Sequence, residues 1–436
     1  MNLTYLQKNG APQLLLIYAG WSTDPEAFEK IVCPGYDIAV AWDYSSLQPV
    51  ADADGYDEVV VIAWSLGVLA AELTAGSLPL TLTVAVNGTP EPADDEKGIP
   101  LLIFRRTAEE LTERSLAKFR LRMGAPDMAR GARSIASLRD ELLGFIGRRS
   151  DGRFRWDRAV ISRGDRIFPP ANQEAAWLGK AEITMIDGPH TPDFQSIVDA
   201  FVINKSLVGA RFAKGRDSYD GEADVQHRIA DRLFSLWQKH GVTPYGHILE
   251  IGVGNGYFTS LYAPKTRAAI TLWDIAPTSA ENVVRADAEQ SLPKVADARL
   301  DAIASASTMQ WFNSAAAFLR QCARTLRPGG LAVLSTFGPD TFRQLTEAGA
   351  VPLPYLSVAS LRRIMPPELE ILEMLDGKIQ KVFDSPVDVI RHLKATGVNA
   401  RPVRRPLRQI LDDYPRRPDG RCGLTYQPIY MILKRK

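Results

Sequence analysis

The fold is decided by residues 248–256, which read Ile248-Leu249-Glu250-Ile251-Gly252-Val253-Gly254-Asn255-Gly256. An apolar, β-branched run followed by glycines at alternate positions predicts a buried strand that breaks into a tight turn. Glycine adopts positive φ and lets a bulky, charged ligand approach the bare backbone. The spacing is Gly-x-Gly-x-Gly behind a glutamate, which differs from the GxGxxG of dinucleotide-binding folds. On its own the turn is either a cofactor loop or a structural strand-to-helix connection, so its neighbours have to decide.

The segments around this turn supply the other parts of a nucleotide-binding unit. Residues 225–239 have the spacing of an amphipathic helix, and residues 268–273 form an apolar strand that ends at Asp274. An acid at the tip of the second strand is placed to hold a ribose diol. A third strand is predicted at residues 300–305. Strands and helices in this order indicate a Rossmann-like α/β domain.

This half of the chain resembles the class I methyltransferases that use S-adenosyl-L-methionine (SAM). The resemblance implies that the cofactor is bound by Glu250, Gly252, Gly254, Gly256, Asp274, Asp287 and Gln310. Asp287 would meet the adenine amino group, and Tyr219 and Trp311 would line the pocket of the methyl acceptor. The span from Asp274 to Asp287 is short, so the helix usually found between them has to be clipped. No metal is expected.

Composition limits what the chain can be. With 436 residues it is too long for one ordinary core, so two domains are expected, and 45% hydrophobic residues suffice to build them. A formal net charge of +1 does not point to nucleic acid or to a membrane as a partner. No targeting segment and no apolar run of about 18 residues is evident. Three widely separated cysteines fit neither a disulfide framework nor a zinc site, so a cytoplasmic location is expected.

The first half contains the elements of a serine hydrolase. Residues 58–64 form an apolar strand that runs into Ser65, which resembles a nucleophile elbow although Ala63 replaces the first glycine of G-x-S-x-G. Further strands lead to Asp165 and to His190, which gives the Ser, Asp, His order of α/β-hydrolases. In that geometry Ser65 is the nucleophile, His190 the base and Asp165 the acid that orients the base.

Two backbone N–H groups are the expected oxyanion donors, those of Trp21 and Leu66. Trp21 follows the first core strand, and Leu66 follows the nucleophile. Asp187 and Asp193 are rival acids, but they lie too near His190 in sequence to face its far nitrogen easily.

A helical, arginine-rich segment is predicted at about residues 105–150. An insertion between the core strands of a hydrolase is usually a cap over the active site. Its arginines are either a solvated face or a docking surface for an acidic carrier protein, because guanidinium groups suit phosphates and carboxylates.

Seven blocks of the first half carry a more specific likeness: Tyr-Ala-Gly-Trp at 18–21, Trp-Asp-Tyr at 42–44, Ala-Trp-Ser-Leu-Gly at 63–67, Asn-Gly-Thr-Pro at 87–90, residues 94–100, Asp-Arg-Ile-Phe-Pro at 165–169 and Gly-Pro-His at 188–190. Together they resemble the BioG family of pimeloyl-[acyl-carrier protein] methyl ester esterases, which act in biotin synthesis. The resemblance covers roughly residues 3–203. It implies an α/β-hydrolase domain with a helical cap at residues 1–204.

The second half carries its own blocks, at residues 212–214, 218–220, 225–226, 310–312, 335–338, 392–397 and 424–426. These resemble BioC, the malonyl-[acyl-carrier protein] O-methyltransferase, and imply a methyltransferase domain at residues 208–436. Val253 and Asn255 replace the commoner Cys and Thr of its loop, which is harmless if the backbone does the binding. Residues 208–221 are interpreted as a polar bridge between the two halves.

The two resemblances together imply a bifunctional biotin-synthesis enzyme. One half would methylate the carboxylate of malonyl-[acyl-carrier protein], and the other would cleave pimeloyl-[acyl-carrier protein] methyl ester. Two alternatives remain: the hydrolase half is an inactive docking module for the carrier protein, or a small-molecule carboxyl methyltransferase is joined to an unrelated esterase.

Overall fold

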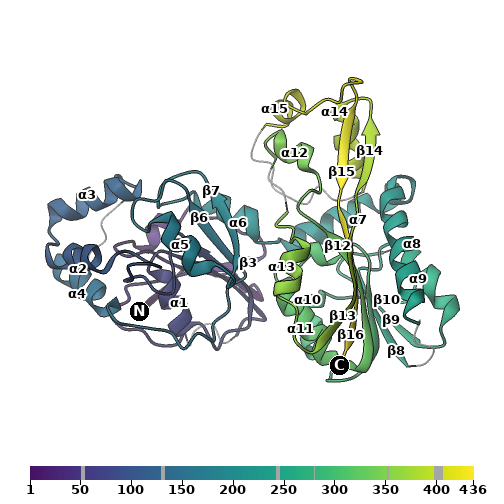
Figure 1. Ribbon diagram of the computed structural model, residues 1–436, viewed down its shortest axis with the longest axis horizontal. Helices are drawn as coiled ribbons and strands as arrows, with labels where there is room; N and C mark the ends of the chain where they lie inside the picture. The colour runs from purple at the N-terminus through teal and green to yellow at the C-terminus, as the bar shows by residue number, and fades with distance from the viewer. Residues whose placement is uncertain (51–54, 129–132, 242–245, 279, 351–352, 397–405) are drawn as a thin grey trace. The chain divides into compact units, whose positions relative to one another are not determined.

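The computed structural model describes residues 1–50, 55–128, 133–241, 246–278, 280–350, 353–396 and 406–436, without the side chains of residues 215–222. The chain divides into two compact units, Met1–Val198 and Asp199–Lys436. The expected domains of the two halves were 1–204 and 208–436. Each unit contains its own β-sheet with helices packed around it (Figure 1).

The described part of the first unit is built on a seven-stranded sheet in the order β1-β3-β2-β4-β5-β6-β7. The strands are β1 (Asn2–Gln7), β2 (Gln13–Tyr18), β3 (Tyr36–Trp42), β4 (Glu58–Trp64), β5 (Leu80–Val86), β6 (Arg158–Ser162) and β7 (Glu182–Ile186). Only β1 pairs antiparallel within this sheet, so the C-terminal ends of the other strands meet at one edge. Apolar side chains of β2 and β4 are buried, as expected for strands covered on both faces.

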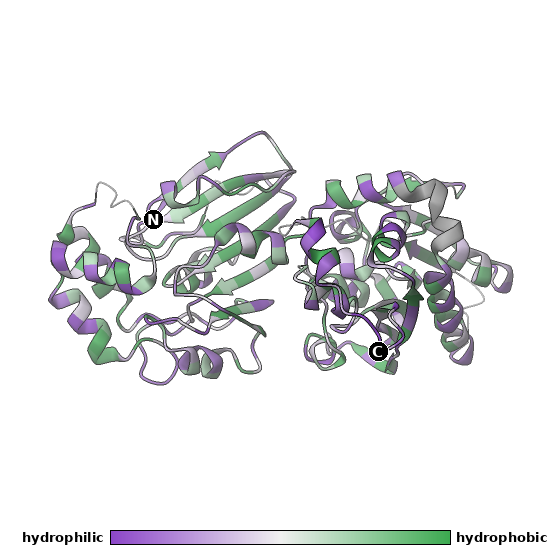
Figure 2. Cartoon of the chain, turned by 90° about the horizontal axis from the view of Figure 1, so that it is seen from above, coloured by the Kyte–Doolittle hydropathy of each residue, from purple (hydrophilic) through white to green (hydrophobic). Residues whose placement is uncertain are grey.

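The described helices of the first unit are η1 (Pro25–Phe28), α1 (Gly67–Thr74), α2 (Leu101–Glu109), α3 (Glu113–Met123), α4 (Ile135–Phe145), α5 (Pro170–Trp177) and α6 (Phe194–Phe201), which runs past the boundary. Helices α2 to α4 lie between residues 101 and 145, where the sequence predicts a helical segment at about residues 105–150. Thr112 and Ser134 cap α3 and α4 with their side chains. Figure 2 shows hydrophobic residues concentrated on the sheet strands, while the helices alternate between hydrophobic and hydrophilic.

The described part of the second unit has a sheet in the order β10-β9-β8-β11-β12-β16-β13 and a separate pair, β14-β15. Its strands are β8 (His247–Ile251), β9 (Ala269–Asp274), β10 (Val283–Arg285), β11 (Leu300–Ser305), β12 (Leu326–Phe337), β13 (Leu369–Asp376), β14 (Ile379–Phe383), β15 (Cys422–Tyr426) and β16 (Pro428–Arg435). The run from β10 to β12 is parallel, and β16 pairs antiparallel with both β12 and β13. The predicted strand and glycine turn at residues 248–256 are thus found at β8, the middle strand of the parallel run from β10 to β12.

Helices cover both faces of this sheet, α8 and α9 on one side and α10, α11 and α13 on the other (Figure 1). The described helices of the unit are α7 (Lys205–Glu222), α8 (Asp224–Lys239), α9 (Tyr257–Tyr262), η3 (Ala263–Lys265), α10 (Ala288–Ser291), η4 (Leu292–Lys294), η5 (Met309–Trp311), α11 (Ala315–Thr325), α12 (Arg343–Glu347), α13 (Val358–Arg363), α14 (Pro386–Ala395) and α15 (Leu407–Asp412). In its described residues, the span between β9 and β10 holds no helix, which confirms the clipped connection.

The interpretation of residues 208–221 as a polar bridge is wrong, because these residues belong to α7. The side chain of Asn204 caps this helix by accepting from the Leu207 N–H at 2.8 Å. Val208 and Phe212 pack against Trp311, so tertiary contacts stabilise a helix whose sequence lacks a clear apolar stripe.

None of the helices in the described ranges is long and apolar enough to cross a membrane. The side chains of Cys33, Cys322 and Cys422 are all buried.

Candidate active sites

The first candidate site begins at the sharp turn between β4 and α1. Ser65 occupies this turn with φ of 60°, a left-handed conformation that a non-glycine residue adopts at a cost. Gly67 makes the turn possible, because a Cβ there would lie 2.6 Å from the carbonyl oxygen of Tyr18. A Cβ at Gly88 would lie 2.3 Å from the carbonyl oxygen of Ser65, so this position also admits only a glycine. This is the strained strand-to-helix geometry that lifts a serine hydroxyl above a sheet.

Three buried side chains from different strand ends form one hydrogen-bonded chain here. Nε2 of His190 lies 3.1 Å from Oγ of Ser65, and Nδ1 of His190 lies 2.9 Å from Oδ2 of Asp165. The Ser65 and Asp165 residues are 5% and 6% exposed, and His190 is 1% exposed. The Phe168 ring stacks parallel to the imidazole at 5.9 Å, which fixes the plane of the ring.

Asp165 is held as an acceptor by several donors. Oδ1 accepts from the backbone N–H groups of Ile167 at 2.8 Å and Phe168 at 3.0 Å, and Oδ2 accepts from Nε2 of Gln173 at 3.0 Å. Of the rival acids, Asp187 is exposed and pairs with Arg163. The geometry therefore brings Asp165 to His190.

The two expected oxyanion donors lie in turns next to this chain. The backbone N–H groups of Trp21 and Leu66 donate to no acceptor among the described residues. The Trp21 indole donates to the Leu138 carbonyl of α4 at 2.9 Å, which ties this loop to the helical insertion. Thr191 donates its N–H to the Met123 carbonyl at the end of α3, so the histidine loop contacts the insertion as well.

Asn87 supports the site in a way that sequence reasoning missed. Its side-chain amide donates to the carbonyl of His190 and to Oγ of Ser162, both at 2.8 Å, and its Oδ1 accepts from the Ser162 N–H. It therefore fixes the backbone of His190 to β6. Only the family block at 87–90 signalled this residue; no chemical pattern did.

The second candidate site surrounds the glycine turn after β8. Gly252, Gly254 and Gly256 have φ of 75°, 58° and 82°, which other residues rarely adopt. A Cβ at Gly252 would collide with Thr308, whereas a Cβ at Gly254 would meet nothing within 4 Å and would project into open space. The backbone of this turn is thus accessible to a ligand.

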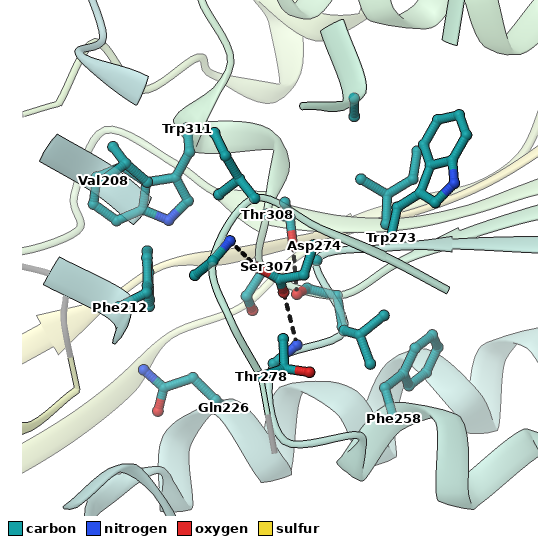
Figure 3. Close-up of a pocket in the computed structure, with 18 of the residues that line it drawn as sticks. Val208, Phe212, Gln226, Phe258, Trp273, Asp274, Thr278, Ser307, Thr308 and Trp311 are labelled. Atoms are coloured by element: carbon teal, nitrogen blue, oxygen red, sulfur yellow. Dashed lines mark hydrogen bonds between the residues drawn. The ribbon is translucent and has the colours of Figure 1, made fainter. Parts of the chain in front are cut away.

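A pocket opens beside this turn, and parts of the chain far apart in sequence form its walls. Helix α7 contributes Val208 and Phe212, which gather with Trp311 on one side (Figure 3). Asp274 and Trp273 lie across from them (Figure 3). Phe212 meets the Trp311 ring edge-on at 5.5 Å, so this wall is apolar.

The predicted residues divide into those that line the pocket and those that do not. Gly252, Gly254, Asp274, Asp287, Gln310 and Trp311 line it. Glu250 and Gly256 are not among its lining residues. Glu250 instead accepts from Oγ1 of Thr259 at 2.6 Å and from the Tyr262 hydroxyl at 2.7 Å, and burial raises its pKa to about 7. The side chain of Tyr219 lies outside the described residues.

The two pocket acids are arranged differently. Asp274 accepts from the N–H groups of Gly254 at 2.9 Å and Ala276 at 2.8 Å. Burial raises the pKa of Asp274, although these hydrogen bonds lower it. Oδ2 of Asp287 is buried without a partner in the described part of the chain. An unpaired buried carboxylate oxygen in a pocket wall calls for a donor from a ligand, and the adenine amino group of SAM is such a donor.

Sequence reasoning missed two further polar groups in the pocket wall, both on α8. Oε1 of Gln226 and Nε2 of His227 are buried and have no partner among the described residues. His227 stacks on the Tyr257 ring at 3.9 Å, next to the glycine turn. Gln226 belongs to the family block at residues 225–226, but no chemical pattern marks either residue, so only the fold places them in the pocket wall.

Comparison with known proteins identifies both units. A family model described as "Pimeloyl-ACP methyl esterase BioG" matches residues 1–197, and one described as "Methyltransferase domain" matches residues 249–334. The second unit accordingly has the class I methyltransferase fold, and its methyl donor is SAM.

Individual relatives match one unit or both. A malonyl-[acyl-carrier protein] O-methyltransferase of Bacteroides fragilis is 33% identical over 98% of this chain and 94% of its own length. One of the same name from Porphyromonas gingivalis is 33% identical over 53% of this chain and 96% of its own length. The crystal structure of BioG from Haemophilus influenzae is 31% identical, covers 44% of this chain and 94% of its own, and has a TM-score of 0.41. Because the likeness to the Bacteroides fragilis protein spans both units, the chain belongs to the malonyl-[acyl-carrier protein] O-methyltransferase family and carries a BioG domain ahead of its methyltransferase domain.

Proposed function

We propose that the chain is a bifunctional enzyme that methylates the carboxylate of malonyl-[acyl-carrier protein] and hydrolyses pimeloyl-[acyl-carrier protein] methyl ester. The names of the BioG family and of the full-length relative support the pair of substrates. The observation that carries the hydrolytic half is the chain Ser65–His190–Asp165, with links of 3.1 and 2.9 Å. Residues 1–204 are then an α/β-hydrolase with α2 to α4 as its cap, and residues 208–436 are the methyltransferase.

The hydrolytic site works through one proton carrier. The Ser65 oxygen adds to the ester carbonyl carbon while its proton passes to Nε2 of His190, and Asp165 stabilises the imidazolium. The carbonyl oxygen becomes an oxyanion, which accepts from the N–H groups of Trp21 and Leu66. His190 then protonates the departing methoxide, which leaves as methanol, and water cleaves the acyl-serine by the same route. Each oxyanion donor contributes about 10²- to 10³-fold in rate.

Methyl transfer to the malonyl carboxylate needs no strong base, because this group is already ionised near neutral pH. SAM supplies an electrophilic methyl group. The chain contributes alignment and exclusion of water. Gly252 and Gly254 would offer bare backbone to the cofactor, Asp274 would hold the ribose diol, and Asp287 would accept from the adenine amino group.

Other residues predicted to bind the cofactor would act indirectly, by holding neighbouring parts of the pocket in place. Glu250 holds Tyr262 and Thr259 of α9 and so fixes the helix that Gly256 begins. Gln310 donates to the Ser307 carbonyl at 2.6 Å, which orients its amide in the pocket wall. Trp311 and Tyr219 remain our candidates for walls of the acceptor compartment.

The cap helices fit the acyl-carrier protein. Exposed apolar side chains stand among cations there: Leu102 and Ile103 with Arg105 and Arg106 on α2, and Leu121 with Arg114, Lys118 and Arg122 on α3. Cations steer an acidic partner, and apolar groups among them supply contact area. When the carrier is docked on the cap, its acyl chain would have to extend from the cap surface to Ser65.

Premature hydrolysis of the short malonyl methyl ester would undo the methylation. The Ser65 residue is only 5% exposed, with the loops above it tied to α3 and α4. We therefore expect that only the longer pimeloyl arm spans the distance from a docked carrier to the serine. Comparable hydrolysis of the malonyl and pimeloyl methyl esters on the carrier would refute this.

A second candidate function is that the first unit only docks the carrier protein. The hydrogen-bonded Ser65, His190 and Asp165 argue against it, because a docking module has no need for them. A fluorophosphonate probe separates the two, since an active hydrolase is labelled at Ser65 and a docking module is not.

A third candidate is a small-molecule carboxyl methyltransferase joined to an unrelated esterase. It requires free malonate or malonyl-CoA to be methylated as fast as the carrier-bound malonyl group.

The proposed function is tested by measuring both reactions of the purified chain on carrier-bound substrates. Malonyl methyl ester should form only with SAM present, and methanol should be released from the pimeloyl ester without SAM.

A further inference from the structure

Lys205, the first residue of α7, joins three segments at the adenine side of the pocket. Its ammonium donates to Oε2 of Glu289 and, at 3.3 Å, to Oδ1 of Asp287. The same ammonium lies 5.1 Å from the centre of the Phe312 ring. Lys205 and Asp287 both line the pocket.

Glu289 in this group is committed to structure. Its two carboxylate oxygens accept the N–H groups of Asn313 at 2.8 Å and Ser314 at 2.9 Å, which lie between η5 and α11. Oδ1 of Asn313 in turn accepts from the N–H of Ile203 at 2.8 Å. Glu289 therefore fixes the segment behind the pocket and leaves Asp287 as the acid for a ligand.

Asp287 is held at one edge only. Oδ1 accepts from Lys205 and, at 3.0 Å, from the N–H of Glu289. Oδ2 is buried and has no partner in the described residues. Lys205 thus selects the orientation in which one oxygen is satisfied and the other is available in the pocket wall.

The charge of Lys205 matters as much as its position. Burial and the charge of Asp287 raise the pKa of Glu289, and Lys205 opposes both. Lys205 therefore offsets the repulsion between the two neighbouring carboxylates and holds both of them in place.

We propose that Lys205 is a positioning residue for adenine recognition, which holds Oδ1 of Asp287 and leaves its Oδ2 to accept from the adenine amino group of SAM. The inference rests on the proposed role of Asp287 in cofactor binding. It predicts that the pocket prefers adenine to hypoxanthine. The Asp287 carboxylate accepts from the amino group of adenine and is repelled by the carbonyl oxygen that hypoxanthine carries at the same position.

The test is calorimetric titration of the full chain with S-adenosylhomocysteine and with its inosine analogue. Wild type should prefer the adenosine form. Lys205→Met should weaken binding of the adenosine form about 10-fold or more, so that the ratio of the Kd values for the two compounds comes close to one. Lys205→Arg, which restores the cation, should recover most of the preference. Lys239→Met on α8 is the matched control at an exposed lysine and should bind as wild type.

Two results would overturn the inference. One is Lys205→Met binding both compounds as wild type does. The other is equal weakening for both compounds, which is the signature of a merely structural role. If wild type itself does not bind S-adenosylhomocysteine, it is the proposed function that fails, so the two failures are distinguishable.

Discussion

Nε2 of His190 lies 3.1 Å from Oγ of Ser65, although 125 residues separate them in the chain. Neighbouring parallel strands bring their loops to one edge of the first sheet. All three side chains of this site belong to the first unit, and the glycine turn and its pocket belong to the second. Single substitutions should therefore separate the two activities.

Replacing the nucleophile should abolish hydrolysis alone. We expect Ser65→Ala to lower methanol release from pimeloyl-[acyl-carrier protein] methyl ester by about 10³-fold or more, because the proposed acyl intermediate forms on the Ser65 hydroxyl. Methylation of the malonyl carrier should stay at the wild-type rate. The exposed Ser45→Ala serves as the control. Undiminished hydrolysis by Ser65→Ala would remove this serine from the mechanism.

Filling the glycine turn should abolish methylation alone. At Gly254, with φ of 58° and open space beside it, an arginine side chain would occupy the pocket and strain the backbone. We expect Gly254→Arg to lose S-adenosylhomocysteine binding and to keep esterase activity. Gly241→Arg is a matched control, since Gly241 also has positive φ and open space but lies after α8. Equal loss in both variants would point to misfolding.

Reversing charge on the cap should weaken capture of the carrier. For the triple variant Arg114→Glu, Lys118→Glu and Arg122→Glu, we expect KM for the carrier-bound ester to rise about 10-fold or more, most clearly at low salt. Hydrolysis of a small free methyl ester should be unchanged. Arg153→Glu, an exposed arginine outside the cap helices, is the control. Unchanged KM in the triple variant would rule out α3 as the docking helix.

The acid of β8 should make the second unit less stable as pH rises. Burial raises the pKa of Glu250 to about 7, against an ordinary value of about 4.3 in an unfolded chain. The folded state then binds the proton more tightly, so its stabilisation is complete below about pH 4.3 and is lost as pH rises through about 7. The loss amounts to a few kcal/mol, at about 1.4 kcal/mol for each pKa unit.

Calorimetric scans between pH 5 and 8 check this, with the transition of the second unit identified by its upward shift in S-adenosylhomocysteine. Glu250→Gln mimics the protonated acid and should flatten the pH dependence of that transition. Identical pH profiles for the variant and the wild type would show that Glu250 stays ionised.

Sequence alone predicted the elements with a strong local signal. The apolar run and spaced glycines at 248–256 gave a strand and a turn with positive φ, because only a few residues set that conformation. The Ser65, Asp165 and His190 side chains were predicted from strand ends and chain order, and the structure brings them within hydrogen-bonding distance.

What sequence did not predict depends on contacts between distant segments. Residues 205–222 contain glycines and charges without an apolar stripe, so their helix is recognised only from its packing on Trp311. Lys205 reaches Asp287 and Glu289 across more than 80 positions of the chain. Local sequence patterns do not reveal contacts between residues so far apart in the chain.

The central claim is tested most directly by complementation of two biotin auxotrophs, one lacking the malonyl methyltransferase and one lacking the pimeloyl methyl esterase. We expect wild type to rescue both strains. Ser65→Ala should rescue only the strain without methyltransferase, and Gly254→Arg only the strain without esterase. Two results would contradict the proposed pair of activities: rescue of the esterase-deficient strain by Ser65→Ala, and failure of wild type to rescue that strain.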